Sequence, residues 1–310
     1  MTPLEALQTA AATYPLQNAW LIISGEDRTR WLNGMVTNNI TTLEPGKGNY
    51  NFLLNAQGRI QGDAYIFNLS NNLLLSTSRT QSTTIAQLLE KFIIMDDVEI
   101  KISTGEGLAV VGPAAKSTLR SMGISTPETQ LSLTHSTFNN ERIDVLYAYS
   151  PGVPRYELYA QDLTPLRQAL ESKGLPTAPT EAVEQLRILE GIPEYGKDIR
   201  DRDLPQETNQ TRALHFSKGC YLGQEIVERI RSRGAVHRTL LQFSLIGDLP
   251  PANTPLEADG KPIGELTSVS KINNIQRAVG YARREALERN ATLTYLGGTA
   301  EPIAQKESHV

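Results

Sequence analysis

The sequence predicts an α+β protein in which antiparallel strands are interspersed with helices, followed by a small C-terminal β-barrel or sandwich. Strand and helix periodicities follow one another up to residue 190, which favours α+β layering over a doubly wound parallel sheet. From Leu240 onward the signal is nearly all short strands, separated by turns such as Asp259-Gly260 and Gly297-Gly298. Because 310 residues exceed what one hydrophobic core usually serves, we expect two or three compact units.

The first hundred residues predict one hairpin with flanking helices and strands. The turn Asn55-Ala56-Gln57-Gly58 separates two strand-like runs, which is a hairpin signature. A helix is expected where Ile85, Leu88, Leu89 and Phe92 recur on one face. In chain order, we expect a helix at 3–14, a strand at 18–24, a turn at 28–35 capped by Asp27, strands at 50–54, 59–68 and 73–78, a helix at 83–95 and a strand at 98–102.

The next hundred residues repeat this pattern loosely. A helix at 181–190 follows Thr180, a natural N-cap, and stops at Gly191-Ile192-Pro193. Before it, we expect strands at 108–111, 143–148 and 156–160 and helices after Pro113 and at 164–172.

The composition argues against several classes of protein. The apolar runs are far shorter than the roughly 20 residues of a membrane span, and the N-terminus lacks a secretory signal, so we expect a cytoplasmic or a processed organellar protein without membrane contact. A net charge of −4 argues against a general nucleic-acid binder. One cysteine and four scattered histidines predict neither an intrachain disulfide nor a structural metal site.

Residues 218–225, with the sequence Lys-Gly-Cys-Tyr-Leu-Gly-Gln-Glu, contain the one cysteine of the chain. Cys220 lies between Gly219 and Gly223, which permit tight turns and close backbone approach, and the ammonium group of Lys218 would favour the thiolate. Such a cysteine can act as a nucleophile, a redox centre or a soft-metal ligand. The alternative is a buried cysteine that fills space as a small hydrophobe.

A basic helix is expected directly after this segment, at 224–232. Ile226 and Ile230 would lie on its buried face, with Gly234 beyond its end. Basic residues outnumber acidic ones in and around this helix. This excess predicts an anion site for a folate glutamyl tail or for tRNA phosphates, whereas the alternative is a solvated helix face with Glu–Arg pairs. The stretch from 218 to 238 sets Lys218, Arg229, Arg231, Arg233 and Arg238 against Glu225 and Glu228.

The motif at 218–225, with Val227-Glu228-Arg229 and Arg233-Gly234 after it, resembles the signature of the YgfZ family. These folate-binding proteins are related to the glycine-cleavage T-protein (aminomethyltransferase) and are implicated in iron–sulfur cluster maintenance and, through cluster enzymes, in tRNA modification. The resemblance spans most of the chain in the expected order. Supporting matches lie at 24–27, 37–38, 55–63, 187–199, 204–207 and 263–268.

The resemblance implies a T-protein-like cloverleaf of antiparallel α+β subdomains with a C-terminal β-barrel, around a channel for tetrahydrofolate. The folate-binding region would cover 1–238, with an inner subdomain at about 48–105, and the barrel 239–310. Cys220, Lys218 and Asp63 are the catalytic candidates it suggests. The implied partners are a reduced folate and iron–sulfur enzymes or cluster assembly factors. The candidate folate-binding residues are Asp63, Glu190, Tyr195, Tyr221, Arg229 and Arg238.

The sequence departs from the T-protein pattern at two places. T-proteins carry two adjacent aspartates where this chain has Gly62-Asp63, so the first carboxylate is absent. The expected pterin-anchoring glutamate is replaced by Leu189, and Glu190 is displaced by about 100° around a helix. The alternative interpretations are a polar strand end for Asp63, a solvated helix end for Glu190 and a core ring for Tyr195. These departures favour a folate-binding accessory protein for iron–sulfur enzymes that uses Cys220, with a one-carbon transferase such as an aminomethyltransferase as the alternative.

Overall fold

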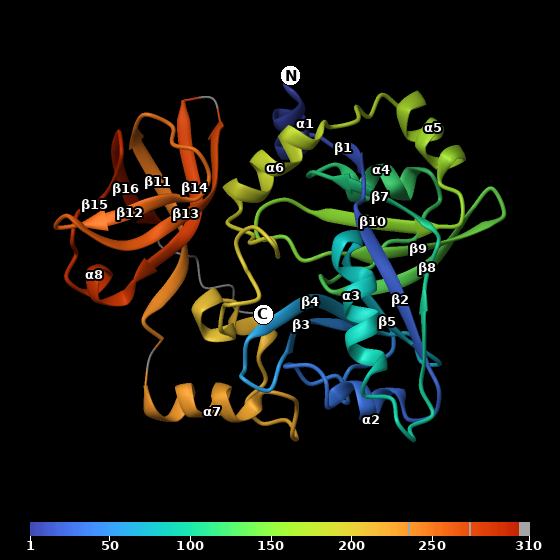
Figure 1. Ribbon diagram of the computed structural model, residues 1–310. Coiled ribbons are helices and arrows are strands. Elements are labelled where there is room, and N and C mark those ends of the chain that lie inside the picture. Colours follow the sequence, from blue (N-terminus) through green and yellow to red (C-terminus); the bar gives the residue numbers. More distant parts are fainter. Residues whose placement is uncertain (235, 273, 304–310) are drawn as a thin grey trace. The chain divides into compact units, whose positions relative to one another are not determined.

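The computed structural model of the protein describes residues 1–234, 236–272 and 274–303 (Figure 1). The chain forms two compact units. The first contains Met1–Leu53, Gly62–Val183 and Ser217–Tyr221, and the second contains Leu54–Gln61, Glu184–Phe216 and the chain from Leu222 onward. Within the described residues, every helix is too short or too polar to cross a lipid bilayer.

The first unit contains a five-stranded sheet with the order β3-β4-β5-β2-β6. Helix α3 (Arg79–Glu90) covers one face of this sheet, where Ile85 packs in a buried cluster with Ile66, and Figure 1 shows α3 alongside β2 and β5. Because side chains alternate along a strand, Asp63 and Tyr65 of β4 lie on the face opposite to Ile66. The strands are β2 (Asn18–Ser24), β3 (Gly48–Leu54), β4 (Ile60–Asn68), β5 (Leu73–Ser78) and β6 (Glu99–Ile102).

The first unit also contains an antiparallel sheet with the order β1-β7-β10-β9-β8. Leu119 of α4 and Leu166 and Leu170 of α5 are buried in one cluster with Leu158 of β10. The elements are β1 (Ala12–Pro15), β7 (Glu106–Val111), α4 (Ala115–Ser121), β8 (Ser132–Phe138), β9 (Glu141–Tyr147), β10 (Arg155–Ala160) and α5 (Thr164–Ser172), and α1 (Pro3–Thr9) and α2 (Arg28–Asn33) lie in the same unit.

The second unit is built on a closed barrel with the strand order β11-β14-β13-β12-β15-β16. Phe243 and Leu256 are fully buried in its core. The strands are β11 (Arg238–Gly247), β12 (Thr254–Ala258), β13 (Lys261–Ile272), β14 (Ile275–Arg283), β15 (Leu293–Tyr295) and β16 (Gly298–Ile303). The remaining helices are α6 (Thr180–Leu189), α7 (Gln224–Arg233) and α8 (Arg284–Glu288), and two 3-10 turns are η1 (Pro205–Thr208) and η2 (Thr211–Ala213).

The mixture of strands and helices followed by a closed barrel confirms the predicted fold class. The helix predicted at 3–14 is wrong beyond Thr9, because residues 12–15 pair with β7 as strand β1. The helix predicted at 83–95 begins at Arg79 and ends at Glu90, and Ile94 and Met95 are exposed in the loop that follows. Asp27 precedes α2 but accepts from the backbone N–H of Asp97 instead of capping the helix. Strand β8 was not predicted.

Candidate functional site

The carboxylate of Asp63 is held by side chains from two neighbouring elements. The Tyr50 hydroxyl on β3 donates to Asp63 Oδ2 at 2.5 Å, and Gln81 Nε2 on α3 donates to Asp63 Oδ1 at 2.8 Å. Gln81 Oε1 also accepts from the Asp63 backbone N–H at 3.1 Å. Both carboxylate oxygens are therefore fixed in direction, as a binding group for a ligand must be.

Gly62 faces the opposite side of β4 from Asp63. A Cβ atom at position 62 would lie 3.1 Å from the side chain of Ile85 and 3.2 Å from Gln81 Oε1. A side chain there would point into the core beneath α3, which is closely packed. An aspartate at position 62 would therefore point away from the Asp63 side chain. On the face of β4 that carries Tyr65, the carboxylate is that of Asp63.

A second buried charged group, not predicted from the sequence, lies on β10. Glu157 is only 4% exposed, and its carboxylate accepts from the Tyr159 hydroxyl at 3.0 Å and pairs with Arg155 at 3.0 Å. Burial, together with Glu157, raises the pKa of Tyr159 well above its usual value. A charged residue between Tyr156 and Leu158, two positions after Arg155 in the same short strand, is the signal that could have revealed this group.

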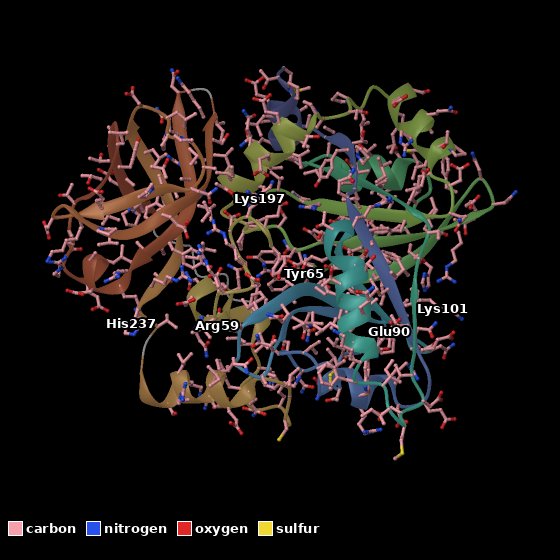
Figure 2. All side chains as sticks on the ribbon, viewed as in Figure 1. Arg59, Tyr65, Glu90, Lys101, Lys197 and His237 are labelled. Atoms are coloured by element: carbon pink, nitrogen blue, oxygen red, sulfur yellow. The ribbon has the colours of Figure 1, made fainter. Side chains whose placement is uncertain are left out.

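Arg155 brings this group to the face of the first sheet. Its guanidinium lies 5.7 Å from the centre of the Tyr14 ring, and Tyr65 lies near enough to Arg155 to contribute to the raised pKa of its guanidinium. Figure 2 shows Tyr65 on β4, on the side of that strand turned toward the sheet that contains β10. Arg155 Nε is buried and has no hydrogen-bond partner among the described residues. A donor left without an acceptor in a polar interior indicates a place for a ligand or an ordered water.

Lys218 is buried, and its ammonium group binds three backbone carbonyls. Lys218 Nζ donates to the carbonyl oxygens of Asn33 at 2.7 Å, Val36 at 2.6 Å and Asn38 at 2.7 Å. It also lies 5.0 Å from the centre of the Tyr221 ring. Burial lowers the pKa of Lys218 to about 7, whereas three carbonyl acceptors favour the ammonium form. All three ammonium hydrogens are used by these carbonyls, an arrangement that the sequence did not predict.

Cys220 is exposed, two residues beyond this anchor. The buried ammonium group of Lys218 is connected to Asp63 through Asn38 and Tyr50. Asn38 Nδ2 donates to the Tyr50 carbonyl at 3.0 Å, and the Tyr50 hydroxyl donates to Asp63. The matches at 37–38, 55–63 and 218–225 thus supply residues along one hydrogen-bonded path within the first unit. The exposed thiol fits the functional interpretation of the motif better than the space-filling one.

In the second unit, the hairpin turn at 55–58 contacts the C-terminal end of the motif at 218–225. Gly223 adopts a φ of +81°, and a Cβ atom there would lie 2.5 Å from the Asn55 carbonyl oxygen. A Cβ atom at Gly58, which also has a positive φ, would lie 2.7 Å from Ile226 Cβ on α7. Both glycines are required for close contact between the hairpin turn and α7. Gly219, by contrast, has open space where a Cβ would lie.

The predicted basic patch is largely paired. Arg238 donates to Asp203 at 2.6 Å and to Glu207 at 3.2 Å, and it lies 4.5 Å from the centre of the Tyr281 ring. Arg231 lies over the Phe216 ring and 3.5 Å from Glu228, as the alternative interpretation expected. Arg229 is exposed, and the side chain of Arg233 lies outside the described part of the chain.

The other two predicted folate ligands, Glu190 and Tyr195, are half-buried in the second unit. Glu190 follows the last residue of α6, and Tyr195 forms an isolated bridge with Ile199. Asp63, Lys218, Cys220 and Tyr221 belong to the first unit.

The motif residues at 187–199 and 263–268 form one buried network. Asp198 is fully buried, pairs with Arg187 at 2.6 Å and accepts from Thr267 at 2.5 Å and from Ser268 at 2.7 Å. Arg187 also pairs with Glu184 at 2.7 Å. Burial opposes the charge of Arg187, but these carboxylates raise its pKa above the usual value. The network joins α6 and the following turn to barrel strand β13.

Helices and sheets of this arrangement, with a closed C-terminal barrel, define the aminomethyltransferase fold. The structure matches the crystal structure of glycine cleavage system aminomethyltransferase T from Bartonella henselae with a TM-score of 0.87 and 16% identity, over 98% of this chain and 87% of that one. Residues 17–218 match the GCVT N-terminal domain family, and the chain belongs to that family. Residues 238–306 match the CAF17 C-terminal beta-barrel domain.

Curated relatives fall into more than one group. A putative chloroplastic transferase of Arabidopsis thaliana, At1g60990, is 24% identical over 88% of this chain, which spans 65% of that protein's length. The aminomethyltransferase of Frankia alni is 27% identical over 84% of this chain and 74% of its own. The mitochondrial iron–sulfur cluster assembly factor IBA57 homolog of Pyricularia oryzae is 27% identical over 88% of this chain and 68% of its own. These matches confirm a YgfZ-like relative of the T-protein.

Proposed function

We propose that this protein is a folate-binding accessory factor that supports the assembly or repair of iron–sulfur clusters in cluster-dependent enzymes, tRNA-modifying enzymes among them. The observation that carries the proposal is the exposed Cys220 on a loop fixed by the buried ammonium group of Lys218. The similarity to IBA57 homologs and the CAF17-type barrel support the same role.

The residues of the first unit fit a reduced folate such as tetrahydrofolate. A pterin is flat and has both donors and acceptors on its edge. The carboxylates of Asp63 and Glu157 are acceptors for its N–H groups, and Arg155 Nε is a buried donor without a partner among the described residues. The rings of Tyr50 and Tyr65, 4.8 Å apart between their centres, offer aromatic faces. When bound, the folate would supply a carrier for one-carbon groups.

Cys220 would act on the cluster, which is the cargo of the reaction. The thiol would lose its proton to solvent, and the thiolate sulfur would donate an electron pair to a cluster iron as a transient ligand, while a previous ligand of that iron leaves with its own electron pair. No electron is transferred in this ligand exchange. The fixed loop holds the sulfur in one place, so less conformational freedom is lost when the cluster binds.

A tetrahydrofolate-dependent aminomethyltransferase, or another one-carbon transferase, is the second candidate. The match to the GCVT family and the oriented carboxylate of Asp63 favour it. An assay for methylene-tetrahydrofolate formation from an aminomethylated lipoyl carrier separates the two functions, because the accessory role predicts no turnover.

Folate binding is tested by calorimetric titration with tetrahydrofolate. We expect Asp63→Asn to weaken binding by about tenfold or more, since a hydrogen bond to a charged group contributes about 1.5–3 kcal/mol. Asp201→Asn, at an exposed position in the second unit, is the matched control and should bind like the wild type. Equal affinity of the Asp63→Asn variant and the wild type would reject Asp63 as a folate ligand.

The role of the thiol is tested in cells that lack the protein. Wild-type protein should restore the activity of cluster-dependent enzymes, whereas Cys220→Ala should not, although its far-ultraviolet circular dichroism and melting temperature are unchanged. Full restoration by a folded Cys220→Ala variant would remove the cysteine from the mechanism and leave folate binding as a separate question.

A further inference from the structure

A cavity of about 550 Å³ opens within the first unit, at the ends of the two sheets. Its lining comes from β2, β9 and β10, from the first turn of α3 and from the residues after β6. Asp63, Tyr50 and Glu157 are not among these residues, so the cavity is distinct from the proposed folate site. Its volume lies in the range of about 300–1,000 Å³ that small-molecule sites occupy.

Two buried aromatic rings form the apolar part of the lining. Trp20 and Tyr159 are 6% and 7% exposed, and their ring centres are 3.7 Å apart with a tilt of 35°. Tyr159 is fixed by Glu157 and by Asn18 Nδ2 at 3.4 Å, so this surface exists before any ligand binds. Trp20 Nε1 is buried and finds no acceptor in the described part of the chain. The cavity therefore has a rigid aromatic wall whose one indole N–H is unsatisfied.

The positive charge that faces the cavity belongs to Arg79. This residue is the first of α3, a helix whose N-terminus has no side-chain cap and no acidic residue in its first turn. Its Nε donates to the Asn18 carbonyl at 3.3 Å, and within the described ranges the two terminal nitrogens of its guanidinium form no hydrogen bond or ion pair. Helix dipole and guanidinium thus add to a local positive potential that no nearby carboxylate on α3 offsets.

The other charges of the lining are compensated or exposed. Arg142 pairs with Asp144 at 3.2 Å, and His135 contacts both of them. Glu141 is exposed at the start of β9, where solvent screens its charge. The hydroxyl groups of Ser103 and Thr104 add neutral donors to the same lining.

We propose that this cavity binds a small aromatic carboxylate, with its ring against Trp20 and Tyr159 and its negative group at Arg79 and the first turn of α3. None of the residues that would contact the carboxylate ligand is a proposed folate ligand or part of the cysteine motif, although Tyr159 donates to Glu157, which is a proposed folate ligand. Arg79 favours a negatively charged ligand over a neutral one, and the rings of Trp20 and Tyr159 favour a flat ligand over a bulky one.

The test compares benzoate with benzamide, which has nearly the same shape and no charge. Each is titrated into the full ¹⁵N-labelled chain while the indole N–H signals are recorded, of which the protein has two, from Trp20 and Trp31. Trp20→Phe identifies the Trp20 signal by its loss. Trp31 Nε1 already donates to the Phe92 carbonyl at 3.1 Å, so its signal serves as the internal control.

We expect benzoate to shift the Trp20 signal saturably and to bind at least about tenfold more tightly than benzamide, since a charge-assisted pair with arginine is about twice as strong as a neutral one. Arg79→Gln should reduce benzoate to the affinity of benzamide, with an unchanged melting temperature. Glu141→Gln and Asp63→Asn should leave benzoate binding undiminished. Absence of a saturable shift, equal affinity for the two probes, or retention of benzoate binding in Arg79→Gln would each overturn the proposal.

Discussion

Lys218 Nζ lies 2.7 Å from the carbonyl oxygen of Asn38, a residue whose side chain in turn donates to the backbone of Tyr50. This contact joins two segments that are 180 residues apart in the sequence. The buried ammonium group of Lys218 thus serves as the hydrogen-bond donor for backbone carbonyls between residues 33 and 38. The same contact fixes the loop that carries the exposed thiol of Cys220.

Lys218→Met should lower the free energy of unfolding by about 2–5 kcal/mol, because three buried carbonyl oxygens lose their donor while the side-chain volume is kept. Urea unfolding followed by circular dichroism measures this change. Lys101→Met is the matched control, since Lys101 is exposed and its ion pair is with exposed Glu99, and it should stay within about 0.5 kcal/mol of the wild type. Equal effects of the two substitutions would contradict the buried-cation interpretation.

Cys220 should react with iodoacetamide in the folded protein at a rate typical of an accessible thiol, because its side chain is exposed. Mass spectrometry after short exposure should show one added group, and Cys220→Ser should show none, since the chain has one cysteine. If modification required urea, the thiol would be shielded and the proposed contact with a cluster could not occur.

Local patterns predicted most of the elements that pair or pack with near neighbours. Residues 164–172, with proline in the first turn and an amphipathic face, form a helix within the predicted bounds. Residues 12–15 do not, because their conformation is decided by pairing with β7, about 95 residues away, and no local pattern contains that information.

The sequence was enough to predict the motifs of the site, but not the contacts that their side chains make. The sequence drew attention to Asp63, Lys218 and Cys220, yet only the fold reveals that Lys218 is buried among carbonyls. Glu157 and Arg155 were missed because a single strand pattern does not tell whether a charged residue faces solvent or a second sheet. Arg238, a predicted folate ligand, is engaged by Asp203 and Glu207, acids that lie more than 30 positions earlier.

Gly223→Ala should destabilise the protein by about 1–3 kcal/mol or more, because its φ is left-handed and the added Cβ would meet a backbone oxygen. Gly219→Ala lies in the same motif, where the Cβ has open space, and should change stability by less than about 1 kcal/mol. Thermal unfolding of the two variants measures the difference. A reversed order would mean that the turn before α7 is built differently.

Asp198→Asn should be among the most destabilising single substitutions in the second unit, at about 3–5 kcal/mol, because it removes the charge opposite a buried arginine. Asn keeps the size of the side chain, so the loss reports on charge and hydrogen bonding and not on a cavity.

A double-substitution cycle with Arg187→Met isolates the pair. Arg187→Met leaves the buried carboxylate of Asp198 without its counter-charge, and Asp198→Asn removes one of the carboxylates that pair with Arg187. The double variant should therefore be more stable than the sum of the two single losses predicts, by about 1–3 kcal/mol. Glu184 still pairs with Arg187 when Asp198 is changed, so the coupling energy should fall short of the full single-variant loss. Additive losses in urea unfolding would instead mean that Thr267 and Ser268 hold Asp198 without help from the arginine.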